Sequence, residues 1–200
     1  MVTIDALSVV LPADWIAGPR QGQWAYDDYA ALSEEGQYEV VDGVLYMSPS
    51  PNVDHQEIIG EIFAHLRSFV RATGLGKVFI APLDVKLSYN DVLQPDVFVL
   101  LHEHLDRVIH SHVLGAPDLV IEVTSPSTAR HDLREKQDAY ARAGVSEYWI
   151  VNPDAHTVEL LILQNNVYRS LGLFSGEATL PSLVLSDFST QVSQFFATTT

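Results

Sequence analysis

Cysteine is absent from the 200-residue sequence, and its absence excludes several kinds of chemistry. Disulfide bonds, zinc sites built on thiolates and thiol nucleophiles cannot form without it, and a reducing, intracellular setting is the natural expectation. Residues 1–12 contain no basic region, and no apolar stretch approaches the length that spans a bilayer. We therefore expect an untargeted cytoplasmic protein with no membrane partner.

Basic residues are also scarce. The chain has 11 lysines and arginines against 26 acidic residues, which gives a formal net charge of −15. Affinity for nucleic acid comes mainly from basic side chains that displace counterions from phosphates, so this balance argues against strong non-specific binding. Contact with DNA would have to use a local groove, for which the candidates are Arg130, Arg134, Arg142 and Lys77. A glycine-rich phosphate loop of the nucleotide-binding type is missing as well.

Apolar residues, by contrast, are plentiful. With 47% hydrophobic residues, a chain of this length can bury one well-formed core, and its length does not require a second domain. Prolines and glycines interrupt any regular pattern near the start of the chain, which indicates an N-terminal arm over residues 1–23. We expect a single domain over residues 24–196.

The patterns within this domain predict a mixture of helices and strands. Asp42-Gly43 between two apolar runs in residues 38–47 is typical of a β-hairpin. Apolar residues recur at three- and four-residue spacing over residues 54–73, which predicts a helix with one buried face, and a second helix is expected over residues 130–143. These elements favour an α/β (α+β) fold in which helices flank a mixed central β-sheet and additional β-hairpins are present.

Two carboxylates lie where a charge is costly. Asp96 follows Pro95 and opens the apolar run 97–101, and Glu122 lies near the end of the apolar run 119–123. Runs of this kind are typical of strands that are covered on both faces. An ionised carboxylate in apolar surroundings must be paired, protonated or bound to a metal ion. These positions therefore raise the question of what partner each carboxylate has.

Lys136, on the helix that follows, is the candidate partner. Leu133 and Tyr140 fall on the same helical face, so we expect the lysine to point inward or along the core boundary. Asp132 lies one helical turn before Lys136, which leaves open an ordinary surface ion pair worth roughly a few tenths of a kcal/mol.

Asp96, Glu122 and Lys136 together have the composition of a metal-dependent hydrolytic site. Two carboxylates on neighbouring strands can share a divalent cation such as Mg²⁺, which prefers oxygen ligands. Such an ion polarises a phosphoryl oxygen and lowers the pKa of a bound water, while a nearby ammonium stabilises charge that develops on phosphorus. The three residues therefore suit the hydrolysis of a phosphodiester.

The motifs around these residues resemble those of a known superfamily. Pro95-Asp96 and Glu122-Val123-Thr124 are similar to the signature of the PD-(D/E)XK nucleases, in which an aspartate is combined with an acidic-X-lysine tripeptide. Over residues 24–190 the order of motifs more closely resembles the Uma-type family of restriction-endonuclease-like proteins. The motifs of this resemblance are Tyr38-Glu39, Asp42-Gly43, Ser48-Pro49-Ser50-Pro51, His55, Pro95-Asp96, Ala116-Pro117-Asp118, Glu122, Ser125-Pro126-Ser127-Thr128, Asp132, Lys136, Tyr140, Gly144-Val145 and Glu147-Tyr148-Trp149.

One position departs from the superfamily signature. The third residue of the tripeptide is Thr124 where a lysine is expected, and Lys136 matches the helical position to which the Uma-type family moves this lysine. The resemblance implies that Lys136 is catalytic and that Asp96 and Glu122 hold the metal ion.

Glu39 and His55 are implied by the same resemblance. Glu39 would be a further metal ligand or a contact behind the ligands, although a solvent-facing strand residue fits the pattern equally well. His55, at a helix start on the buried face, would orient a water or the leaving group. The alternative for His55 is a histidine at the edge of the core.

The function implied is a DNA endonuclease that depends on Mg²⁺ or Mn²⁺ and has a restriction-endonuclease-like fold. Its partner would be DNA, and exposed strands allow a homodimer. Two other functions stay open. The acidic composition suits a non-catalytic interaction or regulatory module that retains the nuclease fold. A metal-dependent hydrolase of a small phosphate compound would need no DNA-binding face.

Overall fold

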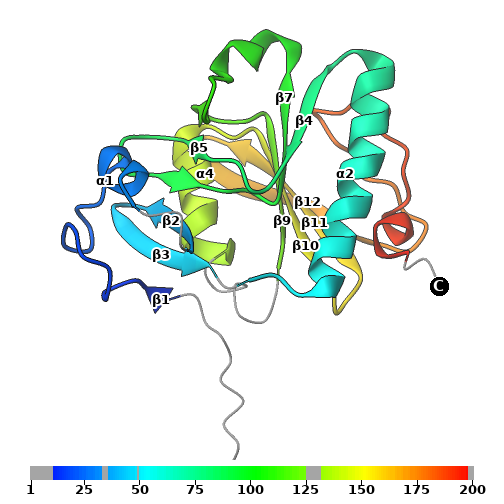
Figure 1. Cartoon of the computed structure of the whole chain (residues 1–200). Helices are drawn as coiled ribbons and strands as arrows, with labels where there is room; N and C mark the ends of the chain where they lie inside the picture. Colours follow the sequence, from blue (N-terminus) through cyan, green and yellow to red (C-terminus); the bar gives the residue numbers. More distant parts are fainter. Residues whose placement is uncertain (1–10, 33–35, 49, 125–131, 198–200) are drawn as a thin grey trace, which may run out of the picture.

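The chain forms two β-sheets with helices packed against them (Figure 1). A computed structural model describes residues 11–32, 36–48, 50–124 and 132–197. Within these ranges the helical elements are α1 (Tyr26–Ala30), α2 (Val53–Thr73), the 3-10 helix η1 (His102–Arg107), the π-helical turn η2 (Asp132–Lys136), α4 (Gln137–Ala143) and the 3-10 helix η3 (Val192–Phe196). None of the helices in the described ranges is long and apolar enough to cross a membrane.

The larger sheet is mixed and lies at the centre of the molecule. Its strands among the described residues, in spatial order, are β12 (Val167–Ser175), β11 (Thr157–Gln164), β10 (Glu147–Asn152), β9 (Leu119–Val123), β7 (Val97–Leu101) and β4 (Gly76–Ile80). β9 and β10 pair in parallel, and the other neighbouring strands pair in antiparallel fashion. The predicted mixed central sheet is confirmed, and β7 and β9 coincide with the two apolar runs that carry the predicted carboxylates.

The smaller sheet is built around the predicted hairpin. In spatial order its described strands are β1 (Leu11–Pro12), β3 (Val44–Ser48), β2 (Gln37–Val41), β6 (Val92–Leu93), β5 (Val85–Lys86) and β8 (Val113–Leu114). Asp42 and Gly43 have φ angles of 52° and 73°, the left-handed conformation that a two-residue turn of this type requires. β1 pairs with β3 and Ala13 is fully buried, so part of the predicted N-terminal arm packs on this sheet.

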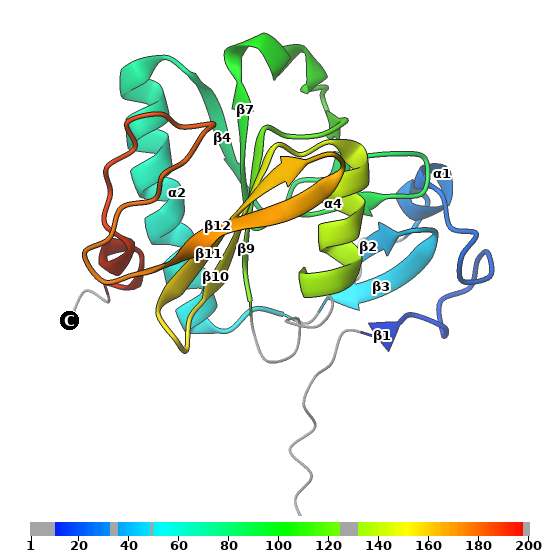
Figure 2. The same cartoon turned by 180° about the vertical axis from the view of Figure 1, so that it is seen from behind.

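Helix α2 covers one face of the larger sheet (Figures 1 and 2). The Asn52 side chain caps its start by accepting a hydrogen bond from the His55 backbone N–H at 2.8 Å. The helix ends at Gly74, which has a φ angle of 70° and so adopts the left-handed conformation that ends many helices. The helix predicted over residues 54–73 is confirmed.

Helix α4 lies on the opposite face and connects two parallel strands (Figures 1 and 2). Because β9 and β10 are parallel neighbours, the chain between them has to cross over the sheet. Ala139 and Tyr140 of α4 belong to one buried cluster with Val120 of β9 and Tyr148 of β10. The second predicted helix is confirmed from residue 132 onward, and its first two residues lie outside the described ranges. This crossover brings the start of α4 over the carboxyl-terminal end of β9.

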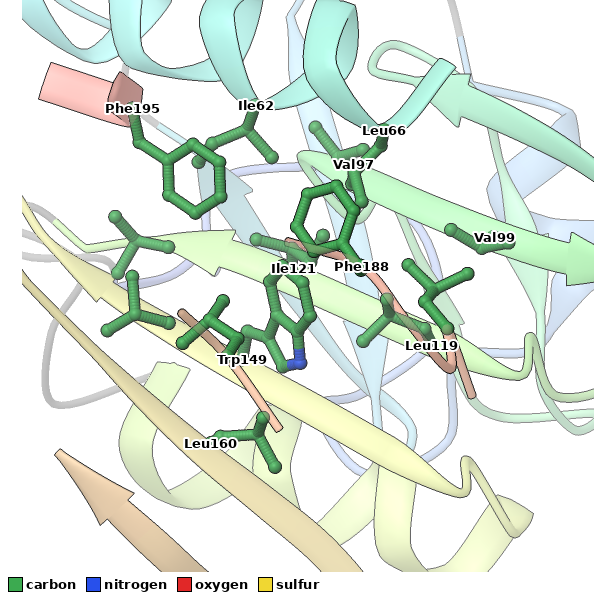
Figure 3. Packing of buried hydrophobic residues seen from close by; sticks show 14 of the residues in the cluster. Ile62, Leu66, Val97, Val99, Leu119, Ile121, Trp149, Leu160, Phe188 and Phe195 are labelled. Atoms are coloured by element: carbon green, nitrogen blue, oxygen red, sulfur yellow. The ribbon is translucent and has the colours of Figure 1, made fainter. Parts of the chain in front are cut away.

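The core between α2 and the larger sheet is apolar and aromatic (Figure 3). Ile62 and Leu66 of α2 face Ile121 and Trp149 of the sheet. Phe188, from the C-terminal segment, closes this core with its ring centroid 6.0 Å from that of Trp149. Because dense packing leaves buried strands little freedom, β9 and its neighbours form a rigid support for the residues at their ends.

Candidate active site

An ammonium group lies between two buried carboxylates where the two sheets meet. Lys136 Nζ is 2.9 Å from Glu39 Oε2 and 3.3 Å from Glu122 Oε1. Glu39 comes from β2 of the smaller sheet, Glu122 from β9 of the larger sheet, and Lys136 from the end of η2. The lysine side chain is 7% exposed and each glutamate side chain 3%. Such burial is tolerated because opposite charges and further hydrogen bonds offset the loss of hydration.

The same helix places a second donor on Glu122. Tyr140 lies one helical turn after Lys136, so the two side chains project on the same side. The Tyr140 hydroxyl donates a hydrogen bond to Glu122 Oε1 at 2.7 Å. Burial, and then the negative charge of Glu122, raises the pKa of Tyr140 well above its usual range, so the phenol stays protonated. The four-residue spacing from Lys136 is the sequence signal that indicates this contact.

Replacing Tyr140 with phenylalanine is expected to lower the free energy of unfolding by about 1.5–3 kcal/mol, because Glu122 loses a buried hydrogen bond. Urea unfolding followed by circular dichroism measures the change. Tyr89→Phe is the matched control, since Tyr89 is 64% exposed and surface changes usually alter stability by less than about 0.5 kcal/mol. Equal stability of Tyr140→Phe and the wild type would show that this hydrogen bond is unimportant.

Glu39 is held in place by groups other than the lysine. The backbone N–H of Gln94 donates to Glu39 Oε1 at 2.8 Å, and the Ser48 hydroxyl donates to Oε2 at 3.3 Å. The side-chain amide of Gln94 donates to Asp84 Oδ1 at 2.8 Å and to the Tyr29 hydroxyl at 3.2 Å. The alternative of a solvent-facing strand residue is therefore wrong for Glu39, because β2 is covered by the rest of the molecule at this position.

Asp96 and His55 form a second cluster beside the first. Asp96 Oδ2 accepts a hydrogen bond from the Val123 backbone N–H at 2.7 Å, and His55 Nε2 lies 3.5 Å from the same oxygen. His55 Nε2 is also 2.8 Å from the carbonyl oxygen of Val123. Because a carbonyl oxygen can only accept, Nε2 carries a proton in this contact. Asp96 lies one step beyond the last paired residues of β7 and β9, opposite Glu122.

Thr124 occupies the position where the superfamily signature has its lysine. This residue is buried, and both its backbone N–H and its hydroxyl donate to the carbonyl oxygen of Val151, at 2.8 and 3.1 Å. It therefore joins the end of β9 to β10. Lys136, at the start of the crossover helix, brings its ammonium group to Glu122, at the helical position that the family resemblance implies for this lysine.

Glu147 is a third buried glutamate, on the strand next to that of Glu122. One carboxylate oxygen accepts the Trp149 indole N–H at 2.6 Å, and the other accepts the backbone N–H groups of Leu183 and Val184 at 2.8 and 3.1 Å. These donors are neutral, and they tie the C-terminal segment to β10. Apart from the family resemblance, the apolar pattern does not separate this structural glutamate from Glu122, because Glu122 lies in one apolar strand and Glu147 begins another.

The predicted metal ligands have suitable chemistry, but the Lys136 ammonium lies between two of them, Glu39 and Glu122. Carboxylate oxygens such as those of Glu39, Glu122 and Asp96 are the ligands that Mg²⁺ and Mn²⁺ prefer. Glu39 and Glu122 flank one nitrogen atom, whereas Asp96 contacts the backbone of β9 and His55. Within the described part of the chain, no group of three or more acidic or histidine side chains is arranged to hold a metal ion.

The basic residues predicted to line a DNA groove lie on separate elements. Arg130 falls outside the described residues. Arg134 is exposed on η2, and Arg142 near the end of α4 forms a partly exposed ion pair. Lys77 lies on β4, beside the end of β7 that is remote from Asp96. In the described structure, the predicted catalytic residues lie in two adjacent clusters, whereas the predicted DNA contacts lie on separate elements.

Comparison with known proteins identifies the family to which this arrangement belongs. Residues 25–193 match the Uma2 family, described as "Putative restriction endonuclease". Among solved structures, the chain is similar to a putative nuclease belonging to DUF820 from Anabaena variabilis, with a TM-score of 0.73 and 21% sequence identity. That match covers 86% of this chain and 97% of the other, and it shows a shared fold. No curated protein matches the chain. Because the family match extends over most of its length, the chain belongs to the Uma2 family of putative restriction endonucleases.

Proposed function

We propose that this protein is a metal-dependent DNA endonuclease that hydrolyses phosphodiester bonds. The family to which it belongs supports this reaction class. The observation that carries the proposal is the contact of one buried ammonium, Lys136, with Glu39 and Glu122 from two different sheets. Burying three charged groups together costs stability relative to well-packed apolar side chains, so their presence favours a functional reason.

Each residue has a role in the proposed reaction. Glu39 and Glu122, with Asp96 beside them, would supply one or two carboxylate ligands at a time to Mg²⁺ or Mn²⁺, and waters would be the other ligands. The ion would polarise a phosphoryl oxygen and activate a water. Lys136 would stabilise the negative charge that develops on the phosphate. His55 has its Nε2–H beside Asp96, from where it would orient the attacking water or protonate the leaving group.

DNA is the proposed substrate despite the formal charge of −15. A cation bound among carboxylates reverses the local field at the place where phosphate has to approach. Binding is therefore expected to be local, weak and sensitive to salt. A homodimer is part of the proposal, because β12 forms an edge of the larger sheet in the described structure and could pair with a second copy.

Cleavage of DNA by the purified protein tests this function. Supercoiled plasmid and single-stranded DNA are incubated with Mg²⁺, Mn²⁺ or EDTA, and the products are separated on gels. We expect cleavage with either ion and none with EDTA. Asp96→Asn should slow cleavage at least about tenfold, as changes around metal ligands usually do. Asp106→Asn, in an exposed part of η1, is the matched control and should cleave normally.

Two results together would reject the nuclease. They are no cleavage of either DNA by the wild type and no binding of Mg²⁺ or Mn²⁺ in calorimetry. That outcome would favour a non-catalytic interaction or regulatory module. This module is the second candidate because the chain has 26 acidic and only 11 basic residues, a balance unfavourable for holding DNA. In such a module the buried charges would serve the fold alone.

A further inference from the structure

The Lys136 ammonium occupies the space between two carboxylates that the proposed function assigns to a metal ion. Its nitrogen lies within hydrogen-bonding distance of Glu39 Oε2 and Glu122 Oε1, and all three residues are buried. Two ionised carboxylates in such a place require a positive counterion. A lysine ammonium and a divalent cation can each provide it.

The two counterions are mutually exclusive at this position. Mg²⁺ binds carboxylate oxygens at about 2.0–2.1 Å and keeps a shell of waters, so it needs the volume that the ammonium fills. A second positive charge beside the same two oxygens would also be repelled by the first. A cation that binds Glu39 and Glu122 must therefore separate them from Lys136.

The carboxylates have other contacts that would keep them in position without the lysine. Glu39 accepts hydrogen bonds from the Gln94 backbone and the Ser48 hydroxyl, and Glu122 accepts one from the Tyr140 hydroxyl. These donors are neutral and lie on elements other than η2. The acceptor groups are therefore preorganised for a cation whether or not the ammonium is present.

The position of Lys136 in the chain suits a side chain that changes partners. It is the last residue of the π-helical turn η2 and directly precedes α4. Such turns are rare and frequently mark functional sites. The lysine has a flexible four-carbon stem, so a change of side-chain rotamer would move its ammonium away from the two carboxylates.

We propose that Lys136 and a divalent cation are alternative counterions of the Glu39–Glu122 pair, so that metal binding displaces the lysine. The displaced ammonium then becomes available to the phosphate of the substrate. This inference rests on the proposed metal dependence. In the metal-free protein, the Lys136 ammonium would stabilise the carboxylates of the metal site, and it would compete with the metal ion for them.

Calorimetric titration with Mn²⁺ tests the competition. Lys136→Met keeps the apolar stem and removes the competing charge, so it should bind Mn²⁺ about tenfold or more tightly than the wild type. Arg71→Met, at an exposed position near the end of α2, is the matched control because it also removes one positive charge, and it should bind like the wild type. Equal or weaker binding by Lys136→Met would overturn the inference.

A second measurement uses the unmodified protein and does not depend on how the variant folds. The chain has three lysines, Lys77, Lys86 and Lys136. An amine-reactive reagent followed by peptide mass spectrometry reports the labelling rate of each. We expect Mn²⁺ to raise the labelling rate of Lys136 severalfold while the other two lysines serve as internal controls. No change at Lys136 under saturating Mn²⁺ would contradict displacement.

The results separate this inference from the proposed function. If the wild type binds Mn²⁺ and cleaves DNA but Lys136→Met binds no more tightly, competition fails and the nuclease stands. If neither the wild type nor Lys136→Met binds Mn²⁺, both the metal dependence and the competition are rejected.

Discussion

Replacing Glu122 with glutamine is expected to slow DNA cleavage by about a hundredfold to a thousandfold while the fold is retained. Glutamine has the same size, and its carbonyl oxygen can still accept the hydrogen bonds that Lys136 and Tyr140 donate to Glu122 Oε1. The substitution removes the negative charge. A site that needs this charge for its metal ion and its lysine would lose activity without losing structure.

Rates of plasmid cleavage at saturating Mg²⁺ provide the measurement, with circular dichroism to show that the variant is folded. Glu147→Gln is the matched control, because it makes the same change at another buried glutamate on the neighbouring strand. At a temperature where it is folded, this control should cleave like the wild type. Normal cleavage by Glu122→Gln would remove Glu122 from the proposed mechanism.

Replacing Glu147 with alanine is expected to lower the free energy of unfolding by at least about 3 kcal/mol, because each buried donor left without an acceptor costs about 1–3 kcal/mol. Its carboxylate accepts three hydrogen bonds, from the Trp149 indole and from two backbone N–H groups of the C-terminal segment. Alanine accepts none of them and leaves a cavity in a fully buried place. The C-terminal segment would lose its main polar attachment to β10.

Urea unfolding measures this loss of stability. Glu177→Ala is the matched control, because Glu177 is exposed and its loss should change the free energy by less than about 0.5 kcal/mol. A change within 1 kcal/mol for Glu147→Ala, taken as roughly one ordinary hydrogen bond, would show that the carboxylate is not structurally important. Mn²⁺ binding by the folded variant should be unaffected, because the proposed ligands lie on other strands.

The contrast between Glu122 and Glu147 shows where sequence reasoning reaches its limit. Glu122 lies within one apolar run and Glu147 begins another, and both are buried. One meets an ammonium and a phenol from the crossover helix, and the other meets an indole and the C-terminal backbone. These partners come from different parts of the chain, so no local pattern distinguishes the two glutamates.

Local chemistry made much of the fold predictable from the sequence. Asp42-Gly43 specifies the turn of the hairpin because few residue pairs tolerate its backbone conformation. The spacing of apolar residues in α2 specifies a helix with one buried face, and the runs 97–101 and 119–123 specify covered strands. Each of these signals lies within a few residues of the structure that it predicts.

The sequence by itself determined the composition of the candidate site, namely two acids in apolar runs and a lysine on the inward face of a helix. Only the tertiary structure decided which groups meet. It placed Lys136 between Glu39 and Glu122, and it placed Asp96 with His55. The physical reason is that a parallel crossover and the junction of two sheets bring together segments that are distant along the chain. Contacts of that kind depend on how whole helices and strands pack, and the spacing of apolar residues along the sequence does not predict this packing.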